Sequence, residues 1–135
     1  MKTLKDLNDS EKLAVIQCGY QIIMSANGNI ISSADDDCIN VILNSVCDNE
    51  LHQNALWNDA IWTDPYNSFT MLRGLLKDKE LRCSFLRMIT DLVDAKNNRG
   101  RFNCAMQVLD FVGYTREEVI AWSKSLRPII FPTYL

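Results

Sequence analysis

The acidic side chains that could bind a metal ion lie in two places along the chain. Asp35 and Asp36 belong to a run of three aspartates, and Asp94 lies far downstream. Calcium takes about six to eight oxygen ligands, so a site made by Asp35, Asp36 and Asp94 requires the two segments to meet in space. The alternative, which we favour, is that the aspartates stabilise the positive end of a helix dipole, because consecutive helical residues point in different directions.

Residues of the nucleophile and base types are also present. His52 is the only histidine, and we expect it at the surface because no residues at zinc-ligand spacing accompany it. Cys83 follows Arg82, Cys104 lies near Arg101, and a neighbouring cation favours the reactive thiolate. We expect both thiols instead to lie in or beside the apolar core, as free cysteines usually do. No nucleophile and base pair can be named, so the sequence predicts a protein that is not an enzyme.

The most unusual composition is that of residues 55–69, ALWNDAIWTDPYNSF. Trp57 and Trp62 are five positions apart, which is about 140° around a helix, so both rings cannot face one core. An exposed tryptophan beside acidic residues is typical of a protein-binding surface. In that interpretation the two tryptophans are anchors, and the polar rim consists of Asp59, Asp64, Tyr66 and Asn67. The alternative is a short helix that packs between others and buries both rings.

Helices are expected to position all of these residues. Apolar residues recur every three and four positions, and no segment alternates apolar and polar residues for long enough to predict a strand. The sequence therefore predicts an all-α, compact bundle of about six to seven helices. They are expected at about residues 10–26, 32–48, 50–62, 65–76, 77–95, 102–112 and 115–125. Thr115 and Glu118 predict a capping box for the last helix, and Pro128 and Pro132 predict that residues 126–135 form an irregular tail that packs back on the domain.

Composition limits the class of protein. The chain has 135 residues, of which 47% are apolar, and we expect one domain over residues 1–135 with its core at about 10–125. A net charge of −3 and the absence of a basic block argue against nucleic-acid binding. The charged start of the chain predicts no signal peptide, and no apolar run reaches the roughly 18 residues of a membrane span. Five widely spaced cysteines without a Cys-x-x-Cys pair favour a reducing, cytoplasmic location.

Two parts of the chain are alike, since residues 20–43 and 85–114 each read as a helix, a polar turn and a helix. Ala26-Asn27-Gly28 stands at the first turn, and Val93-Asp94-Ala95 stands at the second. The chain then continues with Leu109-x-x-Val112-Gly113-Tyr114-Thr115-x-Glu117-Glu118. With these motifs, residues 13–119 resemble the TerB-like family, which is named for tellurite resistance.

The TerB-like resemblance implies an all-helical fold with two related helix-hairpin halves and a stress-related role. It also implies an acidic site for a divalent cation at the two turns. The chain departs from the family pattern, because Asn27 replaces the first turn's aspartate and residues 100–103 lack the acidic partner of the second turn. Arg99 and Arg101 would oppose a cation there. The resemblance therefore supports the fold more firmly than the metal site formed by Asp35, Asp36 and Asp94.

These observations lead to an expected function and two alternatives. We expect a non-enzymatic protein-interaction or scaffold module with a protein partner, without nucleic acid, membrane or cofactor. The first alternative is a domain that binds, or responds to, a divalent metal ion. The second is an acidic inhibitor or immunity-type partner of another protein.

Overall fold

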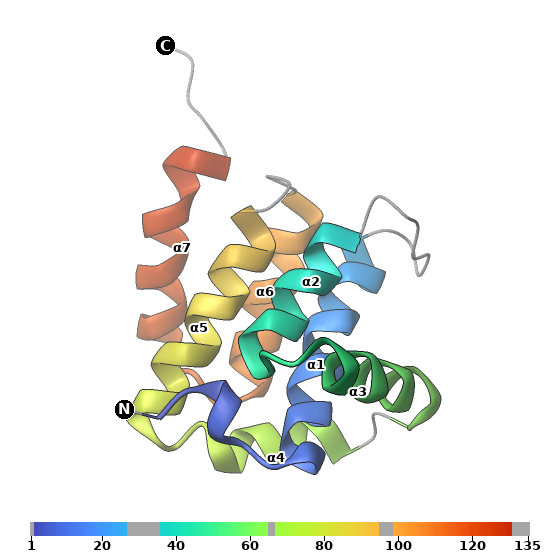
Figure 1. The fold of residues 1–135 in the computed structure, drawn as a ribbon. Helices are drawn as coiled ribbons and strands as arrows, with labels where there is room; N and C mark the ends of the chain where they lie inside the picture. The colour runs from blue at the N-terminus through green and yellow to red at the C-terminus, as the bar shows by residue number, and fades with distance from the viewer. Residues whose placement is uncertain (1, 27–35, 65–66, 95–98, 131–135) are drawn as a thin grey trace.

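The computed structural model describes residues 2–26, 36–64, 67–94 and 99–130, and in these ranges the regular structure is helical (Figure 1). This confirms the all-α bundle predicted from the sequence. Within the described residues, a short 3-10 helix, η1, precedes seven α-helices. The bounds are η1 Leu4–Asp6, α1 Asp9–Ala26, α2 Asp36–Val46, α3 Glu50–Trp62, α4 Ser68–Leu75, α5 Lys79–Asp94, α6 Arg99–Phe111 and α7 Arg116–Ile130. None of the helices in these ranges is both long enough and apolar enough to cross a membrane.

Helix α1 lies at the centre of the bundle and contacts α2, α3, α4 and α6. Because it has neighbours on several sides, its apolar residues are not confined to one stripe. The fully buried ones include Val15, Ile16, Cys18, Ile22 and Ile23. Gly19 allows α2 to approach closely, since a Cβ atom there would lie 2.6 Å from Cδ1 of Ile42.

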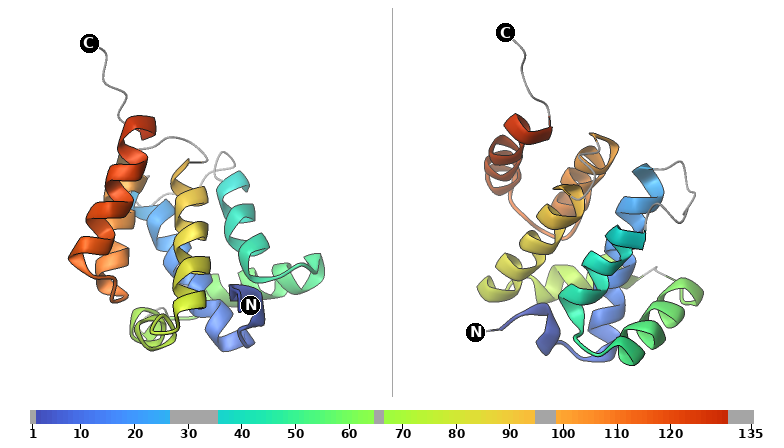
Figure 2. Two further views of the ribbon diagram at one scale, coloured as in Figure 1. Left: turned by 90° about the vertical axis from the view of Figure 1, so that its left-hand side faces the viewer. Right: turned by 45° about the horizontal axis from the view of Figure 1, so that its top comes forward.

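Two helical hairpins form the larger part of the fold. Helices α1 and α2 make the first hairpin, α5 and α6 make the second, and the hairpins pack with α1 against α6 and α2 against α5 (Figures 1 and 2). This reciprocal contact is the pattern that two hairpins related by an approximate twofold axis would give. Helices α3 and α4 are inserted between the hairpins in sequence, and α3 and α7 lie at opposite sides of the molecule in every view.

The corner between α6 and α7 is fixed by a left-handed glycine and a capping box. Gly113 has φ +97°, a conformation that residues with a Cβ rarely adopt. The predicted capping box is confirmed, because Glu118 N–H donates to Thr115 Oγ1 at 3.1 Å and Thr115 N–H donates to Glu118 Oε1 at 2.9 Å. The Tyr114 hydroxyl donates to the Arg82 carbonyl at 2.6 Å and thereby ties this corner to α5.

The carboxylate of Glu118 also pairs with the guanidinium of Arg82, which lies 4.2 Å above the centre of the Tyr114 ring. The hydrogen bond from Arg82 lowers the pKa of Glu118 from its ordinary value of 4.5 to about 2. A pKa that is lower in the folded chain means that the stabilisation is complete above about pH 4.5 and is lost as the pH falls toward 2.

Replacement of Glu118 by glutamine is expected to remove this part of the pH dependence. Because the Glu118 side chain is 42% exposed, the expected loss at neutral pH is below about 1 kcal/mol. Urea unfolding at several pH values between 3 and 7 measures it, with Glu117→Gln at the neighbouring exposed position as the control. A Glu118→Gln variant with the wild-type acid dependence would contradict the assignment of the ion pair.

The end of α7 differs from the prediction. We expected the helix to end near residue 125, but it continues to Ile130 with Pro128 in its last turn. Proline has no backbone N–H and therefore removes one helical hydrogen bond. Because only two helical residues follow Pro128, this missing hydrogen bond affects only the end of the helix. Buried Trp122 stacks on Phe102 with ring centroids 5.6 Å apart and donates to Thr90 Oγ1 at 2.9 Å, which holds α7 on the bundle. Residues 131–135 of the predicted tail lie outside the described residues.

Candidate functional site

Helix α3 has one face in the core, and its opposite, mixed face exposes two large apolar side chains among polar ones. Asn49 caps the helix, since its Oδ1 accepts the N–H of His52 at 2.9 Å. The buried face consists of Gln53, Leu56 and Ala60. Leu51 and Trp62 are each 81% exposed, and eleven residues of helix place them within about 20° of the same side. The exposed side of α3 therefore presents a leucine and a tryptophan to solvent.

The two tryptophans of α3 occupy different environments, as their spacing predicted. Trp57 is half-buried and packs on Tyr20 with ring centroids 5.3 Å apart, whereas Trp62 lies in solvent. Trp57 thus helps to attach α3 to α1, and Trp62 is the one of the two that a partner could contact over most of its surface. The alternative in which both rings are buried is wrong.

The predicted polar rim is described in part. Asp59 and Asp64 are exposed, Asn67 is exposed before α4, and Tyr66 lies outside the described residues. A hollow of about 220 Å³, lined in part by Thr63, Asp64 and Met71, lies where the end of α3 meets α1 and α4. Helix α3 contains Glu50 and Asp59 but no lysine or arginine, so its surface charge is acidic.

A buried glutamine holds the end of α3 in place. The Gln17 side chain of α1 donates to the carbonyls of Ala60 at 3.2 Å and Thr63 at 3.0 Å. Its Oε1 accepts the hydroxyl of Ser68 at the start of α4. The three bonds bring α1, α3 and α4 together, so the helix end that carries Trp62 is held by polar contacts.

The structure does not bring the three predicted metal ligands together within its described part. Asp36 and Asp37 are exposed in the first turn of α2, whereas Asp35 and the side chain of Asp94 lie outside the described residues. Among the described residues, no group of three His, Cys, Asp or Glu side chains could hold a metal ion. The metal site therefore stays a prediction.

Arg101 adds a physical argument against a cation at the start of α2. This arginine was expected to oppose a cation, and its side chain is almost completely buried. Its Nη1 donates to Cys38 Sγ at 2.7 Å, in the first turn of α2 that carries Asp36 and Asp37. A buried positive charge at this point would repel a divalent ion.

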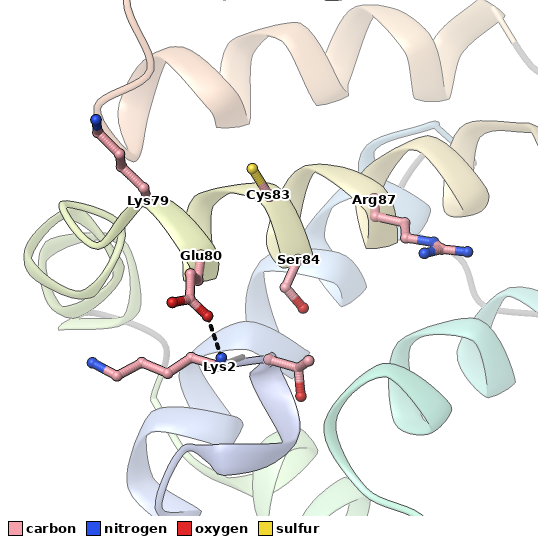
Figure 3. Close-up of a pocket in the computed structure, with 7 residues that line it drawn as sticks. Lys2, Lys79, Glu80, Cys83, Ser84 and Arg87 are labelled. Atoms are coloured by element: carbon pink, nitrogen blue, oxygen red, sulfur yellow. Dashed lines mark hydrogen bonds between the residues drawn. The ribbon is translucent and has the colours of Figure 1, made fainter.

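A second hollow, of about 370 Å³, lies between the N-terminal segment and α5 (Figure 3). Cys83 lines it and is exposed, so the prediction that this thiol lies in or beside the core is wrong, because Cys83 occupies the outer side of α5. Cys104, with intermediate burial, agrees with its prediction.

Figure 3 shows the Lys2 backbone N–H donating to Glu80 on one side of the hollow, while Lys79 and Arg87 extend in different directions. The basic side chains do not converge on one point, and we assign no ligand to this hollow.

The structure also brings together Asp9, His52 and Cys47, which lie on three different segments of the chain. His52 Nδ1 lies 3.1 Å from Cys47 Sγ, and His52 Nε2 lies 2.9 Å from Asp9 Oδ1. The imidazole is 38% exposed, so the expectation of a surface histidine is met in part, but both ring nitrogens are engaged. A thiol, an imidazole and a carboxylate in this order form the arrangement of an activated nucleophile.

The helix ends around these three residues explain why they meet. Asp9 begins α1, Cys47 follows α2, and His52 lies in the first turn of α3. Gln53 Nε2 donates to the Cys47 carbonyl at 2.6 Å, and Cys47 N–H donates to the Leu43 carbonyl at 3.0 Å. The spacing Cys47-x-x-x-x-His52 was a sequence signal that could have drawn attention to the pair, whereas no sequence signal points to Asp9.

Comparison of the chain with protein-family models, curated proteins and solved structures found no match. The resemblance to the TerB-like family thus stays a prediction.

Proposed function

We propose that this chain is a protein-binding module whose partner contacts the outer face of α3. The observation that carries the proposal is the exposure of Trp62 and Leu51, which are each 81% accessible on the same side of the helix. Tryptophan is the residue type most enriched at the energetic centres of protein interfaces, because a single ring buries a large apolar area. Exposed Ala55, between the two, leaves room for a partner to approach the helix.

The charge of the surface indicates the chemistry of the partner. Glu50 and Asp59 lie on α3, Asp64 follows it, and α3 has no basic residue except the single histidine. The surface fits a partner with an apolar groove for Trp62 and a basic rim. Complementary charge of this kind speeds association and excludes wrong partners. The same surface suits a scaffold and an inhibitor of a basic protein, and the identity of the partner distinguishes the two.

Site-specific photo-cross-linking tests the proposal. A photoreactive amino acid at Ala55 is expected to give one discrete protein adduct in lysate of the source cells, and the adduct should be lost when Trp62 is also replaced by serine. Ala121 provides a matched control, because it is an exposed helical alanine on α7, at the opposite side of the molecule (Figure 2). Equal adducts from both positions, or an Ala55 adduct unaffected by Trp62→Ser, would contradict the proposal.

A further inference from the structure

We propose that Cys47 is a peroxide-reducing thiol, with His52 as its acid–base group and Asp9 as the residue that positions His52. This inference is independent of the protein-binding surface on α3. It rests on the chain of contacts from Cys47 Sγ to His52 Nδ1 at 3.1 Å and from His52 Nε2 to Asp9 Oδ1 at 2.9 Å.

The contacts define where the protons lie. The Asp9 carboxylate only accepts hydrogen bonds, so His52 Nε2 carries the hydrogen of that contact. In the neutral imidazole, Nδ1 then has a free lone pair directed at Cys47 Sγ and can take the thiol proton. After the transfer the imidazolium donates to the thiolate through the same contact. His52 is therefore in the correct tautomer for a base toward Cys47.

The groups around Cys47 hold this geometry before any reaction. The Cys47 backbone is bonded on both sides, through its N–H to Leu43 and through its carbonyl to Gln53. The Asn49 cap fixes the backbone of His52. The thiol has a second acceptor, the Asn49 carbonyl, but at 3.6 Å this contact is longer than the one with the imidazole. Little rearrangement is then required for proton transfer.

The burial of Cys47 limits what can react with it. The residue is 6% exposed, and the hollows described above are lined by other residues. A peptide or other macromolecular substrate would need an open cleft beside the sulfur, whereas hydrogen peroxide is little larger than water and the small thiols that return the oxidised sulfur to the thiol need far less space than a peptide. A small peroxide is thus the oxidant that fits the site. The side chain of His52 next to the sulfur is 38% exposed, so solvent reaches the imidazole.

The proposed reaction is a two-electron oxidation of the sulfur. The Cys47 thiol transfers its proton to His52 Nδ1, and the thiolate attacks one oxygen of hydrogen peroxide. The S–O bond forms while the O–O bond breaks, and the leaving hydroxide takes the proton from His52 to become water. Cys47 becomes a sulfenic acid. A low-molecular-weight thiol then displaces water to form a mixed disulfide, and a second one releases Cys47 as the thiol together with the small disulfide.

Trapping of the sulfenic acid tests the proposal. The reduced full-length protein is treated with hydrogen peroxide and a 1,3-dione that reacts with sulfenic acids, and peptide mass spectrometry gives a labelling rate for each cysteine. We expect His52→Gln to slow labelling of Cys47 by about 100-fold, which is the usual scale of general acid–base catalysis. Exposed Cys83 in the same molecule serves as an internal reference, and its rate should not change.

Further variants separate a chemical role from a structural one. Asp9→Asn is expected to slow labelling of Cys47 about tenfold, and Asp9→Glu should restore most of the rate because it restores the acceptor. Peroxide consumption with a small thiol should be lost in Cys47→Ser and retained in Cys83→Ser. A thermal melt of each variant checks that the fold is intact.

Three results would overturn the proposal. The first is equal labelling of Cys47 in the wild type and in folded His52→Gln. The second is labelling of Cys47 only after unfolding in urea. The third is a stable acyl adduct on Cys47 with p-nitrophenyl acetate in the absence of sulfenic acid formation, which would make the reaction an acyl transfer.

Discussion

Replacement of Phe102 by alanine is expected to lower the free energy of unfolding by about 3–5 kcal/mol. Phe102 is completely buried in α6 and stacks on Trp122 of α7 with ring centroids 5.6 Å apart. Removal of the ring leaves a cavity and takes away the surface on which α7 packs. For a domain of this size the midpoint of thermal unfolding should fall by roughly 10–20 °C.

The same helix offers a matched control for this prediction. Phe111 is also in α6 but is 59% exposed. Its ring lies beside that of Phe69, with ring centroids 5.8 Å apart. Phe111→Ala is expected to cost about 1 kcal/mol or less. Urea titrations followed by far-ultraviolet circular dichroism measure both variants, and equal losses would show that Phe102 is not a central part of the core.

The second large effect is expected from Gln17→Leu, at about 2–4 kcal/mol. Leucine has nearly the same size as glutamine but cannot replace its three hydrogen bonds. The carbonyls of Ala60 and Thr63 lose their donor, and the hydroxyl of Ser68 loses its acceptor. Each buried polar group left without a partner costs about 1–3 kcal/mol.

Hydrogen exchange gives this prediction a local readout. The backbone amides at the end of α3 should exchange faster in Gln17→Leu, because that end is held to α1 and α4 by the Gln17 side chain. Gln107→Leu, at an exposed position of α6, should stay within about 0.5 kcal/mol of the wild type. Unchanged exchange at residues 60–63 would show that the three bonds do not hold the helix end.

The features that the sequence predicted correctly are those that depend on local spacing. Apolar periodicity predicted the helices, the Thr115 and Glu118 pair predicted its own capping box, and the interval between Trp57 and Trp62 predicted that the rings diverge. Helix α3 was expected at residues 50–62 and occupies Glu50–Trp62. Its start is set locally, because the side chain of the preceding residue, Asn49, caps it.

The features that the sequence did not predict depend on contacts between distant segments. Asp9 and His52 are 43 positions apart and meet only because α1 and α3 pack together. Gln17 lies within an apolar pattern, so nothing local marks it as the bond between three helices. Cys83 was assigned to the core or its edge from apolar neighbours in sequence, but its position around α5 turns it outward. Helix α7 extends past Pro128 to Ile130, and the sequence did not show that a proline would be tolerated there because only two helical residues follow it.

The central place of α1 has a consequence for biosynthesis. Among the α-helices of the described residues α1 leaves the ribosome first, yet one of its main partners, α6, begins at Arg99, more than seventy residues after α1 ends at Ala26. While the chain is being made, α1 therefore presents apolar surface on sides that have no neighbour yet. Such surface on a nascent chain is what chaperones bind and what drives aggregation. Final burial of α1 has to wait until the second hairpin has been synthesised, which makes folding of this bundle a late event.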